Sequence, residues 1–312
     1  MRYRSLFKGL STYVPGIKRF KLERSPGAFS ARYCYSVWLR HLVIARNSGL
    51  DVYPKIVAEL GPGNSLGVGL AALISGCDKY YGFDVVELAN AVHNVQVFDD
   101  LVSLFKNRAS VPGDDEFPNV KPYLENYDFP EDIFVEERLR QALEESRLDR
   151  IRNSITDFQH RDSPIQYKVP WHDAGVLEAE SVDMIYSQAV LEHVDDLVNT
   201  YRSMRRWLRS NGYISHQIDF KSHGTAGEWN GHWKYADFSW KLIRGKRPYL
   251  LNREPYSTHL AILKEQGFNI VCEKRIRSES RLTINDLAPR FRTISADDLT
   301  TSGAFIQAIK IA

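Results

Sequence analysis

A glycine-rich turn follows a short apolar stretch near residue 60 of the chain. The segment ELGPGNSLG runs from Glu59 to Gly67, directly after the residues KIVA. At the end of a buried strand, such a turn lets a ligand approach the backbone closely, because glycine has no side chain to obstruct it. Three ligands are candidates for this turn: a dinucleotide, a nucleoside triphosphate and S-adenosylmethionine.

Residue types within the turn discriminate among these ligands. A triphosphate loop needs a Lys-Ser/Thr pair at its helix start, and this turn has no lysine. A dinucleotide fingerprint would have its third glycine where Leu66 stands, and Gly67 comes one residue late. The carboxylate of Glu59 would repel a pyrophosphate, whereas it suits the ammonium and sulfonium groups of S-adenosylmethionine. The turn therefore favours S-adenosylmethionine.

Apolar runs alternate with helical segments along the chain, as expected for a parallel α/β sheet. Strands are expected at residues 55–60, 80–85, 165–169, 183–188, 212–219, 269–276 and 304–311. Two connections, at about residues 90–162 and 221–255, are much longer than the usual short loops. We expect residues 1–50 to form an N-terminal helical lead-in, and residues 51–312 to form one domain that contains both insertions.

Four segments in order resemble the class I S-adenosylmethionine-dependent methyltransferases, from about residue 55 to the C-terminus. The first motif of that family, E/D-x-G-x-G-x-G, is similar to Glu59–Ser65, with Ser65 in place of the last glycine. The acidic residue after the second strand of the family corresponds to Asp84, and later segments correspond to SVDMIYSQAVLEHVDDL and RRWLRSNGYI. The resemblance implies a Rossmann-like α/β fold with a seven-stranded, mostly parallel sheet, an antiparallel last strand and helical insertions. The Leu-Glu-His-Val segment resembles the group that methylates small molecules.

The resemblance also implies which residues bind the cofactor, S-adenosylmethionine. Glu59 is expected to face its methionine ammonium and Asp84 to accept both ribose hydroxyls, unless Asp84 is only a solvated carboxylate at a strand end. The other expected cofactor residues are the glycines Gly61 and Gly63, Val85 against the adenine, Trp171, His172 and Asp173 in the turn beside the adenine, and Ser187 and Gln188 near the methionine portion. Trp171 has the alternative role of a core aromatic.

Methyl transfer to a poor nucleophile, such as a sugar hydroxyl, needs a base. His193 is one candidate, because an unperturbed histidine titrates near neutral pH, although a histidine at a helix start can equally bond the backbone. His216, Asp219 and His223 are the second candidates, although alternation along a regular strand puts His216 and Asp219 on opposite faces. These three residues and His232 could in principle bind a divalent metal, but their spacing matches no standard ligand motif, so no metal is expected.

The second insertion holds three of the six tryptophans of the chain. Dense aromatic residues in a connecting segment suit a wall that stacks on a sugar-like acceptor, although they can also anchor the insertion on the body. The expected acceptor residues are Trp229, His232, Trp233 and Arg253, with helix capping as the alternative for Arg253. Residues 95–160 and 221–255 are expected to close together over the methyl group, because both leave the carboxyl edge of the sheet.

The composition of the chain limits which binding partners and which cellular compartment are expected. The chain has 41 basic and 39 acidic residues, a balance that offers no footprint for nonspecific nucleic-acid binding. Three dispersed cysteines indicate reduced thiols of a cytoplasmic protein, and no apolar run is long enough to span a bilayer. The basic N-terminus is either a partly ordered lead-in or a peripheral contact with an anionic membrane through Lys8, Lys18, Arg19 and Lys21 with Phe7 and Phe20.

Together these features predict methyl transfer to a small-molecule acceptor. The expected acceptor is a hydroxyl of a sugar or of a glycan or natural-product intermediate, as in polysaccharide biosynthesis. A nucleic-acid or protein acceptor is the alternative within the family, although SQAVLEHV differs from the Asn/Asp-Pro-Pro-aromatic segment of base-methylating enzymes. A non-catalytic scaffold with this fold is the alternative from another class. The identity of the acceptor, the methylated atom and the oligomeric state stay open.

Overall fold

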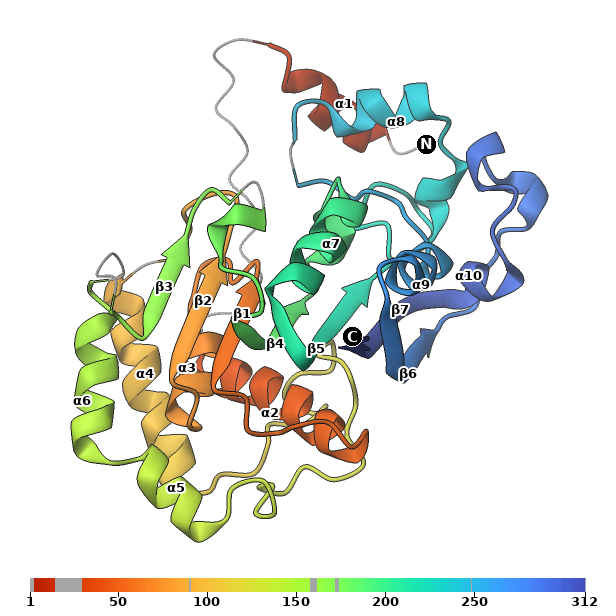
Figure 1. The fold of residues 1–312 in the computed structure, drawn as a ribbon. Coiled ribbons are helices and arrows are strands. Elements are labelled where there is room, and N and C mark those ends of the chain that lie inside the picture. The colour runs from red at the N-terminus through yellow and green to blue at the C-terminus, as the bar shows by residue number, and fades with distance from the viewer. Residues whose placement is uncertain are drawn as a thin grey trace.

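A seven-stranded sheet forms the centre of the protein (Figure 1). The computed structural model describes residues 3–14, 30–89, 91–157, 162–171, 174–247 and 249–311. The strands are β1 (Ile56–Leu60), β2 (Lys79–Phe83), β3 (Ile165–Lys168), β4 (Val182–Gln188), β5 (Leu208–Asp219), β6 (Phe268–Arg277) and β7 (Thr301–Lys310). They lie in the order β3-β2-β1-β4-β5-β7-β6, and β7 runs antiparallel to its two neighbours whereas the other paired strands are parallel. The predicted fold is confirmed, including the antiparallel last strand.

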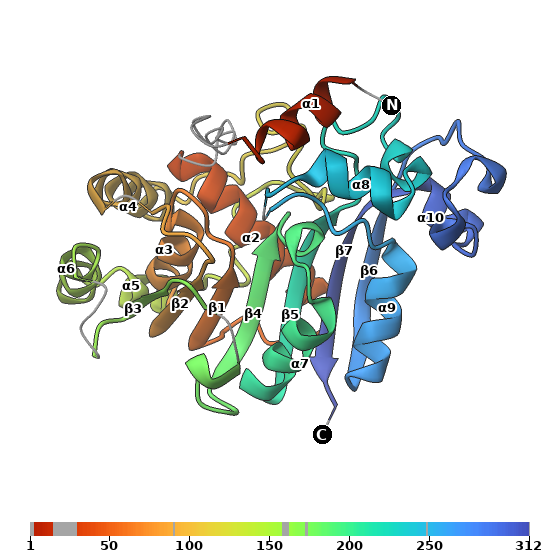
Figure 2. The same ribbon diagram turned by 90° about the horizontal axis from the view of Figure 1, so that it is seen from above.

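Helices cover both faces of this sheet, as Figures 1 and 2 show. The α-helices are α1 (Tyr3–Ser11), α2 (Ala31–Asn47), α3 (Gly67–Ile74), α4 (Ala91–Lys106), α5 (Glu136–Ala142), α6 (Glu145–Ser154), α7 (Leu197–Trp207), α8 (Asp237–Arg244), α9 (Tyr256–Glu265) and α10 (Ala296–Thr300). Short 3-10 helices are η1 (Ala174–Val176), η2 (Leu191–His193), η3 (Gly231–Lys234), η4 (Ile284–Asp286) and η5 (Pro289–Phe291). Helices α2, α3 and α4 lie on one face, and α7 and α9 lie on the other. Within the described residues, no helix combines the length and the apolar character that crossing a membrane requires.

Successive residues of the central strands point into opposite layers. In β1, Val57 belongs to the apolar cluster that includes α2 and α3, whereas Ala58 belongs to the cluster that includes α7 and α9. This alternation follows from the two-residue period of a strand. Because both faces of the sheet are covered at its centre, β1 reads as a mostly apolar run in the sequence.

Helix α2 is part of the core rather than a separate lead-in. Its Trp38 is fully buried in the cluster that also contains residues of β1 and α3. Its Arg40 is equally buried, and the guanidinium donates hydrogen bonds to the backbone oxygens of Val120 (3.2 Å) and Pro122 (2.7 Å). The core therefore crosses the boundary expected near residue 50, and Arg40 holds the loop between α4 and α5 against α2.

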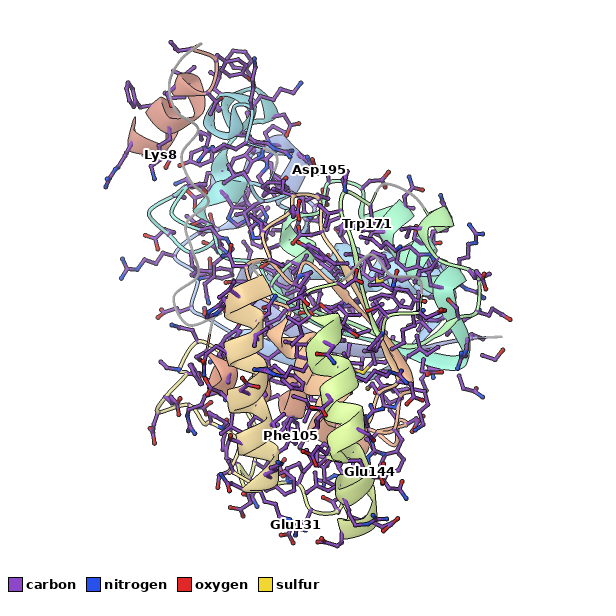
Figure 3. All side chains as sticks on the ribbon, turned by 90° about the vertical axis from the view of Figure 1, so that its left-hand side faces the viewer. Lys8, Phe105, Glu131, Glu144, Trp171 and Asp195 are labelled. Carbon is purple, nitrogen blue, oxygen red and sulfur yellow. The ribbon has the colours of Figure 1, made fainter. Side chains whose placement is uncertain are left out.

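The two insertions occupy different flanks of the sheet. The first, between β2 and β3, contains α4, α5 and α6, and Figure 3 shows α4 and α6 side by side. The second, between β5 and α9, contains η3 and α8. In Figures 1 and 2, α8 lies beside α1, at the end of the molecule away from α5.

Candidate active site

The predicted glycine turn connects β1 to α3. Gly61 and Gly63 have φ angles of +65° and +69°, which favour glycine over residues with a side chain. A Cβ atom at Gly61 would lie 2.7 Å from the side chain of Val190, whereas one at Gly63 would meet no atom within 4 Å. Gly61 therefore packs directly against the segment after β4, and open space adjoins Gly63.

Asp84 follows β2 and joins the glycine turn to the neighbouring strand. Its Oδ2 accepts a hydrogen bond from the backbone N–H of Gly63 (3.1 Å), and its Oδ1 accepts one from Val85 (2.8 Å). The carboxyl is buried, and this burial raises the pKa of Asp84 above its ordinary value. Because β1 and β2 are adjacent and parallel, their carboxyl ends bring the turn and Asp84 together.

Glu59 lies beneath the turn, among the side chains that pack with α2 and α3. Its Oε2 accepts hydrogen bonds from the hydroxyls of Tyr80 (2.7 Å) and Tyr186 (3.2 Å). Burial raises the pKa of Glu59 to about 7, although both hydroxyls oppose this rise. A contact between Glu59 and the cofactor ammonium stays a prediction, and the observed bonds make this side chain a buried support of the turn.

The predicted adenine residues lie at the ends of β2 and β3. Trp171 is partly exposed, and its ring packs against Phe83 and Trp207 at centroid distances of 5.8 and 5.6 Å. Val85 is 44% exposed, so its side chain is available to a ligand. Two further predicted positions, His172 and Asp173, lie outside the described residues. Trp171 thus has core contacts together with a partly open face.

Ser187 and Gln188 are the last two residues of β4, and their side chains have different surroundings. Ser187 is fully buried, and its hydroxyl lies 2.8 Å from Nδ1 of His216. The side-chain amide of Gln188 donates a hydrogen bond to the backbone oxygen of Lys121 (3.0 Å). Gln188 therefore ties β4 to the first insertion, whereas Ser187 bonds inside the core.

The three predicted catalytic residues lie together where β4 and β5 end. Oδ2 of Asp219 lies 3.4 Å from Nε2 of His223, and the ring centroids of His193 and His223 are 5.2 Å apart. His216 instead bonds Ser187 in the core, as the alternation along β5 requires. In the part of the chain that the structure describes, no group of three or more His, Cys, Asp or Glu side chains is arranged to hold a metal ion.

The surroundings of these residues set their charges. Burial, and then the neighbouring His223, lower the pKa of His193 to about 4, so His193 is neutral at physiological pH. Burial by itself would raise the pKa of Asp219, but the hydrogen bond with His223 and the charge of Lys221 outweigh it and lower that pKa. Asp219 is therefore ionised, and its carboxylate can orient the ring of His223.

A cavity of about 370 Å³ lies between the first insertion and the carboxyl ends of β4 and β5. Its walls come from α2, the loop after α4 and the sheet: Tyr33, residues 116–121, Gln188, Ala189, Gln217, Asp219, Lys221, Ile276, Ser302 and Gly303. Charged groups of both signs line it, and the carboxylate of Glu116 is paired with Arg32 at 2.6 Å. Tyr33 and Phe117 add aromatic surface, with ring centroids 5.7 Å apart. The lining suits a small polar molecule without a large net charge.

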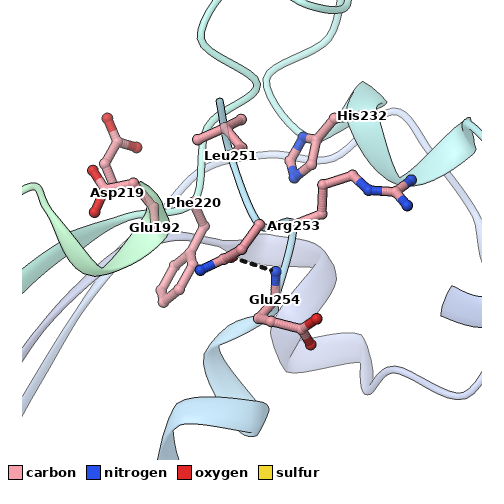
Figure 4. Close-up of a pocket in the computed structure, with 8 residues that line it drawn as sticks. Glu192, Asp219, Phe220, His232, Leu251, Arg253 and Glu254 are labelled. Atoms are coloured by element: carbon pink, nitrogen blue, oxygen red, sulfur yellow. Dashed lines mark hydrogen bonds between the residues drawn. The ribbon is translucent and has the colours of Figure 1, made fainter. Parts of the chain in front are cut away.

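A second, much smaller cavity shares Asp219 with the first (Figure 4). Its volume of about 10 Å³ is close to what one water molecule needs. Glu192, His232 and Arg253 are among its lining residues. Burial raises the pKa of Glu192 well above its ordinary value, which favours the neutral acid. Asp219 therefore borders both the larger cavity and the second insertion.

A comparison with known protein families bears on this geometry. Residues 140–215, which span β3, β4 and α7, match the methyltransferase domain family. The same chain has the strand order and the glycine turn described above. The match supports a class I S-adenosylmethionine-dependent methyltransferase. The cofactor of this class is S-adenosylmethionine.

Several solved structures are similar to this chain at low sequence identity. An S-adenosylmethionine-dependent methyltransferase from Mesorhizobium loti is 15% identical, with a TM-score of 0.41 over 86% of this chain and 96% of that chain. Phosphoethanolamine N-methyltransferase 2 from Haemonchus contortus, in complex with S-adenosyl-L-methionine, is 13% identical, with a TM-score of 0.45 over 92% and 59% of the two chains. A putative sarcosine dimethylglycine methyltransferase from Galdieria sulphuraria is 12% identical, with a TM-score of 0.45 over 88% and 84%. A search of curated proteins finds no match.

The predicted acceptor residues hold the second insertion in place. Trp233 is fully buried, and its indole N–H donates to the backbone oxygen of Arg253 (2.9 Å). The guanidinium of Arg253 donates to Asp237 (2.7 Å), and the indole of Trp229 donates to a carbonyl just after β6 (2.8 Å). His232 is buried beside the smaller cavity, and none of the four lines the larger one. Acceptor binding by these residues stays a prediction, and their contacts favour the alternative of anchoring.

Tyr33 and residues 116–121 line the larger cavity without having been predicted from the sequence. Residues 116–121 lie in an acidic, proline-rich stretch that carries no motif, and Tyr33 shares the apolar period of α2. Arg40 is the one signal that the sequence offers, because a cation within an otherwise apolar helical run needs buried partners. Of the two segments expected to form a lid, residues 116–121 and Lys221 border the cavity, whereas the helices of the first insertion pack beside α2 and α3.

Proposed function

We propose that this methyltransferase transfers a methyl group from S-adenosylmethionine to a hydroxyl of a small polar acceptor in the larger cavity. A sugar, or a glycan or natural-product intermediate of polysaccharide biosynthesis, is the acceptor class that we favour. The observation that carries the proposal is the ionised Asp219, which lines that cavity and is paired with His223. A hydroxyl is a poor nucleophile and benefits from such a base, whereas an amine acceptor has little need of one.

The residues at the glycine turn fit the cofactor. Open space adjoins Gly63, and Asp84 carries two carboxylate oxygens beside it, which keep acceptor capacity after their backbone bonds. Ribose hydroxyls can donate to these oxygens, and the partly exposed Val85 and Trp171 can contact the adenine. When bound, the cofactor supplies a methyl group that its sulfonium has already activated.

The residues of the chain then align the two substrates, exclude water and accept a proton. Gln188 and Arg40 hold the loop of residues 116–121 at the cavity, which limits access of water. Asp219 takes the hydroxyl proton as the acceptor oxygen reacts, and His223 and Lys221 stabilise the carboxylate before that step. Alignment of the two substrates contributes the larger part of the rate, roughly 7–11 kcal/mol at best.

The test is the Asp219→Asn variant, which removes the base and leaves the glycine turn intact. Transfer of a tritiated methyl group across pools of glycans and small molecules first identifies an acceptor for the wild type. The variant should then lose about 10²–10⁴-fold in rate, while calorimetry shows S-adenosylmethionine affinity within a few fold of wild type. Asp286→Asn, which changes an exposed carboxylate in η4, is the matched control. Full activity in Asp219→Asn, or wild-type transfer to amines or nucleic acid alone, would contradict the proposal.

A further inference from the structure

Helices α1 and α8 are more than two hundred residues apart in the sequence and lie side by side (Figures 1 and 2). A Cβ atom on Gly9 of α1 would lie 2.0 Å from the backbone oxygen of Leu242 in α8, so the two backbones touch. The Oγ1 of Thr12 accepts a hydrogen bond from the backbone N–H of Lys246 (2.8 Å). The two helices therefore form one packed unit.

This unit is attached beside the proposed catalytic residues. The hydroxyl of Ser5 in α1 donates to the backbone oxygen of Gly224 (3.1 Å), the residue that follows His223. On the inner side of α8, Trp240 and Ile243 are buried in a cluster with Leu251. The orientation of the pair relative to the site is thus set by packing on its inner side.

Large apolar side chains of α1, of the two residues Tyr13 and Val14 after it, and of α8 are exposed. The exposed fractions are 71% for Phe7, 43% for Leu10, 51% for Tyr13, 53% for Val14 and 74% for Phe238; we call these five residues the α1/α8 surface. Phe7 and Leu10 are three positions apart and so share one face of α1. Exposed apolar side chains that form a contiguous patch are typical of sites that bind a partner or a membrane.

Basic side chains accompany the α1/α8 surface. Arg4, Lys241 and Lys246 are exposed, and the ammonium of Lys246 lies 5.4 Å from the ring centroid of Tyr13. The carboxylate at the start of α8, Asp237, is already paired with Arg253 (2.7 Å). Among the described residues of the two helices, the charge at this surface is therefore predominantly positive.

We propose that the α1/α8 surface docks on an anionic lipid bilayer. Short helices that present apolar side chains flanked by lysine and arginine bind the boundary between headgroups and acyl chains. Each basic side chain near such a membrane adds attraction to the anionic headgroups. This positive charge favours an anionic bilayer over an uncharged partner as the occupant of the α1/α8 surface. Docking would hold the nearby acceptor cavity close to the membrane, and this inference does not depend on the identity of the acceptor.

The test measures binding of the full chain to vesicles by cosedimentation. Vesicles of phosphatidylcholine mixed with phosphatidylglycerol should bind the protein at low salt, and vesicles of phosphatidylcholine alone should bind it much less. The Phe7→Ser and Phe238→Ser substitutions should each lower the partition coefficient by about tenfold. Lys241→Gln combined with Lys246→Gln should lower it and weaken its salt dependence.

Val135→Ser is the matched control, because Val135 is half exposed at the start of α5, at the other end of the molecule (Figures 1 and 3). Circular dichroism and calorimetric binding of S-adenosylmethionine show that each variant is folded. The inference fails if the wild type does not bind anionic vesicles, or if Val135→Ser weakens binding as much as Phe238→Ser. Concentration-dependent self-association that Phe7→Ser or Phe238→Ser abolishes, without any vesicle binding, would instead identify a second copy of the chain as the occupant.

Discussion

The Glu59→Gln substitution removes a buried carboxylate and nearly preserves its shape. Oε2 of Glu59 accepts hydrogen bonds from Tyr80 and Tyr186, and the carbonyl oxygen of a glutamine can accept the same two. Burial raises the pKa of Glu59 from 4.5 to about 7. Between these values, the folded protein keeps a proton that the unfolded chain has released.

This proton sets the sign and the size of the predicted effect. Because the folded pKa lies above the unfolded one, the stabilising contribution of Glu59 is fully present below about pH 4.5 and is lost as the pH rises through about 7. A rise of this size corresponds to about 3 kcal/mol. Glutamine carries no charge, so residue 59 of the variant causes no loss of stability as the pH rises. The free energy of unfolding of the wild type, relative to the variant, should therefore fall by up to about 3 kcal/mol from pH 4.5 to well above 7.

Urea denaturation followed by circular dichroism, repeated across this pH range, measures the difference. Subtracting the variant from the wild type cancels the contribution of buried histidines such as His193, whose pKa is lowered to about 4. Glu265→Gln, which removes an exposed carboxylate at the end of α9, should follow the wild type. A difference between wild type and Glu59→Gln that does not change with pH would refute the burial argument. Such a result would mean that water or a cation contacts the carboxylate of Glu59 when the protein is in solution.

Two further substitutions test the cofactor site and the loop at the cavity. Asp84→Asn should weaken S-adenosylmethionine binding in calorimetry, since two charge-assisted hydrogen bonds are each worth roughly 1.5–3 kcal/mol, and an unchanged affinity would remove Asp84 from the ribose site. Arg40→Gln should destabilise the protein in urea denaturation by about 1–3 kcal/mol for each buried group left unsatisfied, because the carbonyl oxygens of Val120 and Pro122 lose their donor. The substitution should also expose residues 107–135 to limited proteolysis. Stability and cleavage equal to wild type would show that other contacts hold this loop.

Local patterns in the sequence were sufficient to predict the strands of the sheet. The apolar run KIVAEL became β1 (Ile56–Leu60), and AFIQAIKI became most of β7 (Thr301–Lys310). Strands that are buried on both faces need apolar residues at nearly every position, so they are visible without knowledge of their partners. The turn with Gly61 and Gly63 and the acidic end of β2 could be read in the same way, because adjacent parallel strands bring their carboxyl ends together.

Local patterns could not separate side chains that face a cavity from side chains that anchor an insertion. Trp233 has the residue type expected of an acceptor wall, and yet it is fully buried and bonded to the backbone of Arg253. Stacking on a ligand and packing into a core require the same aromatic surface, so composition does not distinguish them. The loop of residues 116–121 posed the opposite difficulty, because it lines the cavity without any motif.

The sequence by itself determined the strands of the sheet, the glycine turn after β1 and the class of chemistry, because each depends on residues within one or two neighbouring elements. Only the tertiary structure decided that Glu59 is buried under Tyr186, 127 residues away, and that Arg40 holds Pro122, 82 residues away. It also brought Asp219, which is paired with His223, to the wall of a cavity whose opposite side belongs to the first insertion. Burial and the pKa shifts that follow from it are sums over contacts distant in the chain, and no local spacing of residues encodes them.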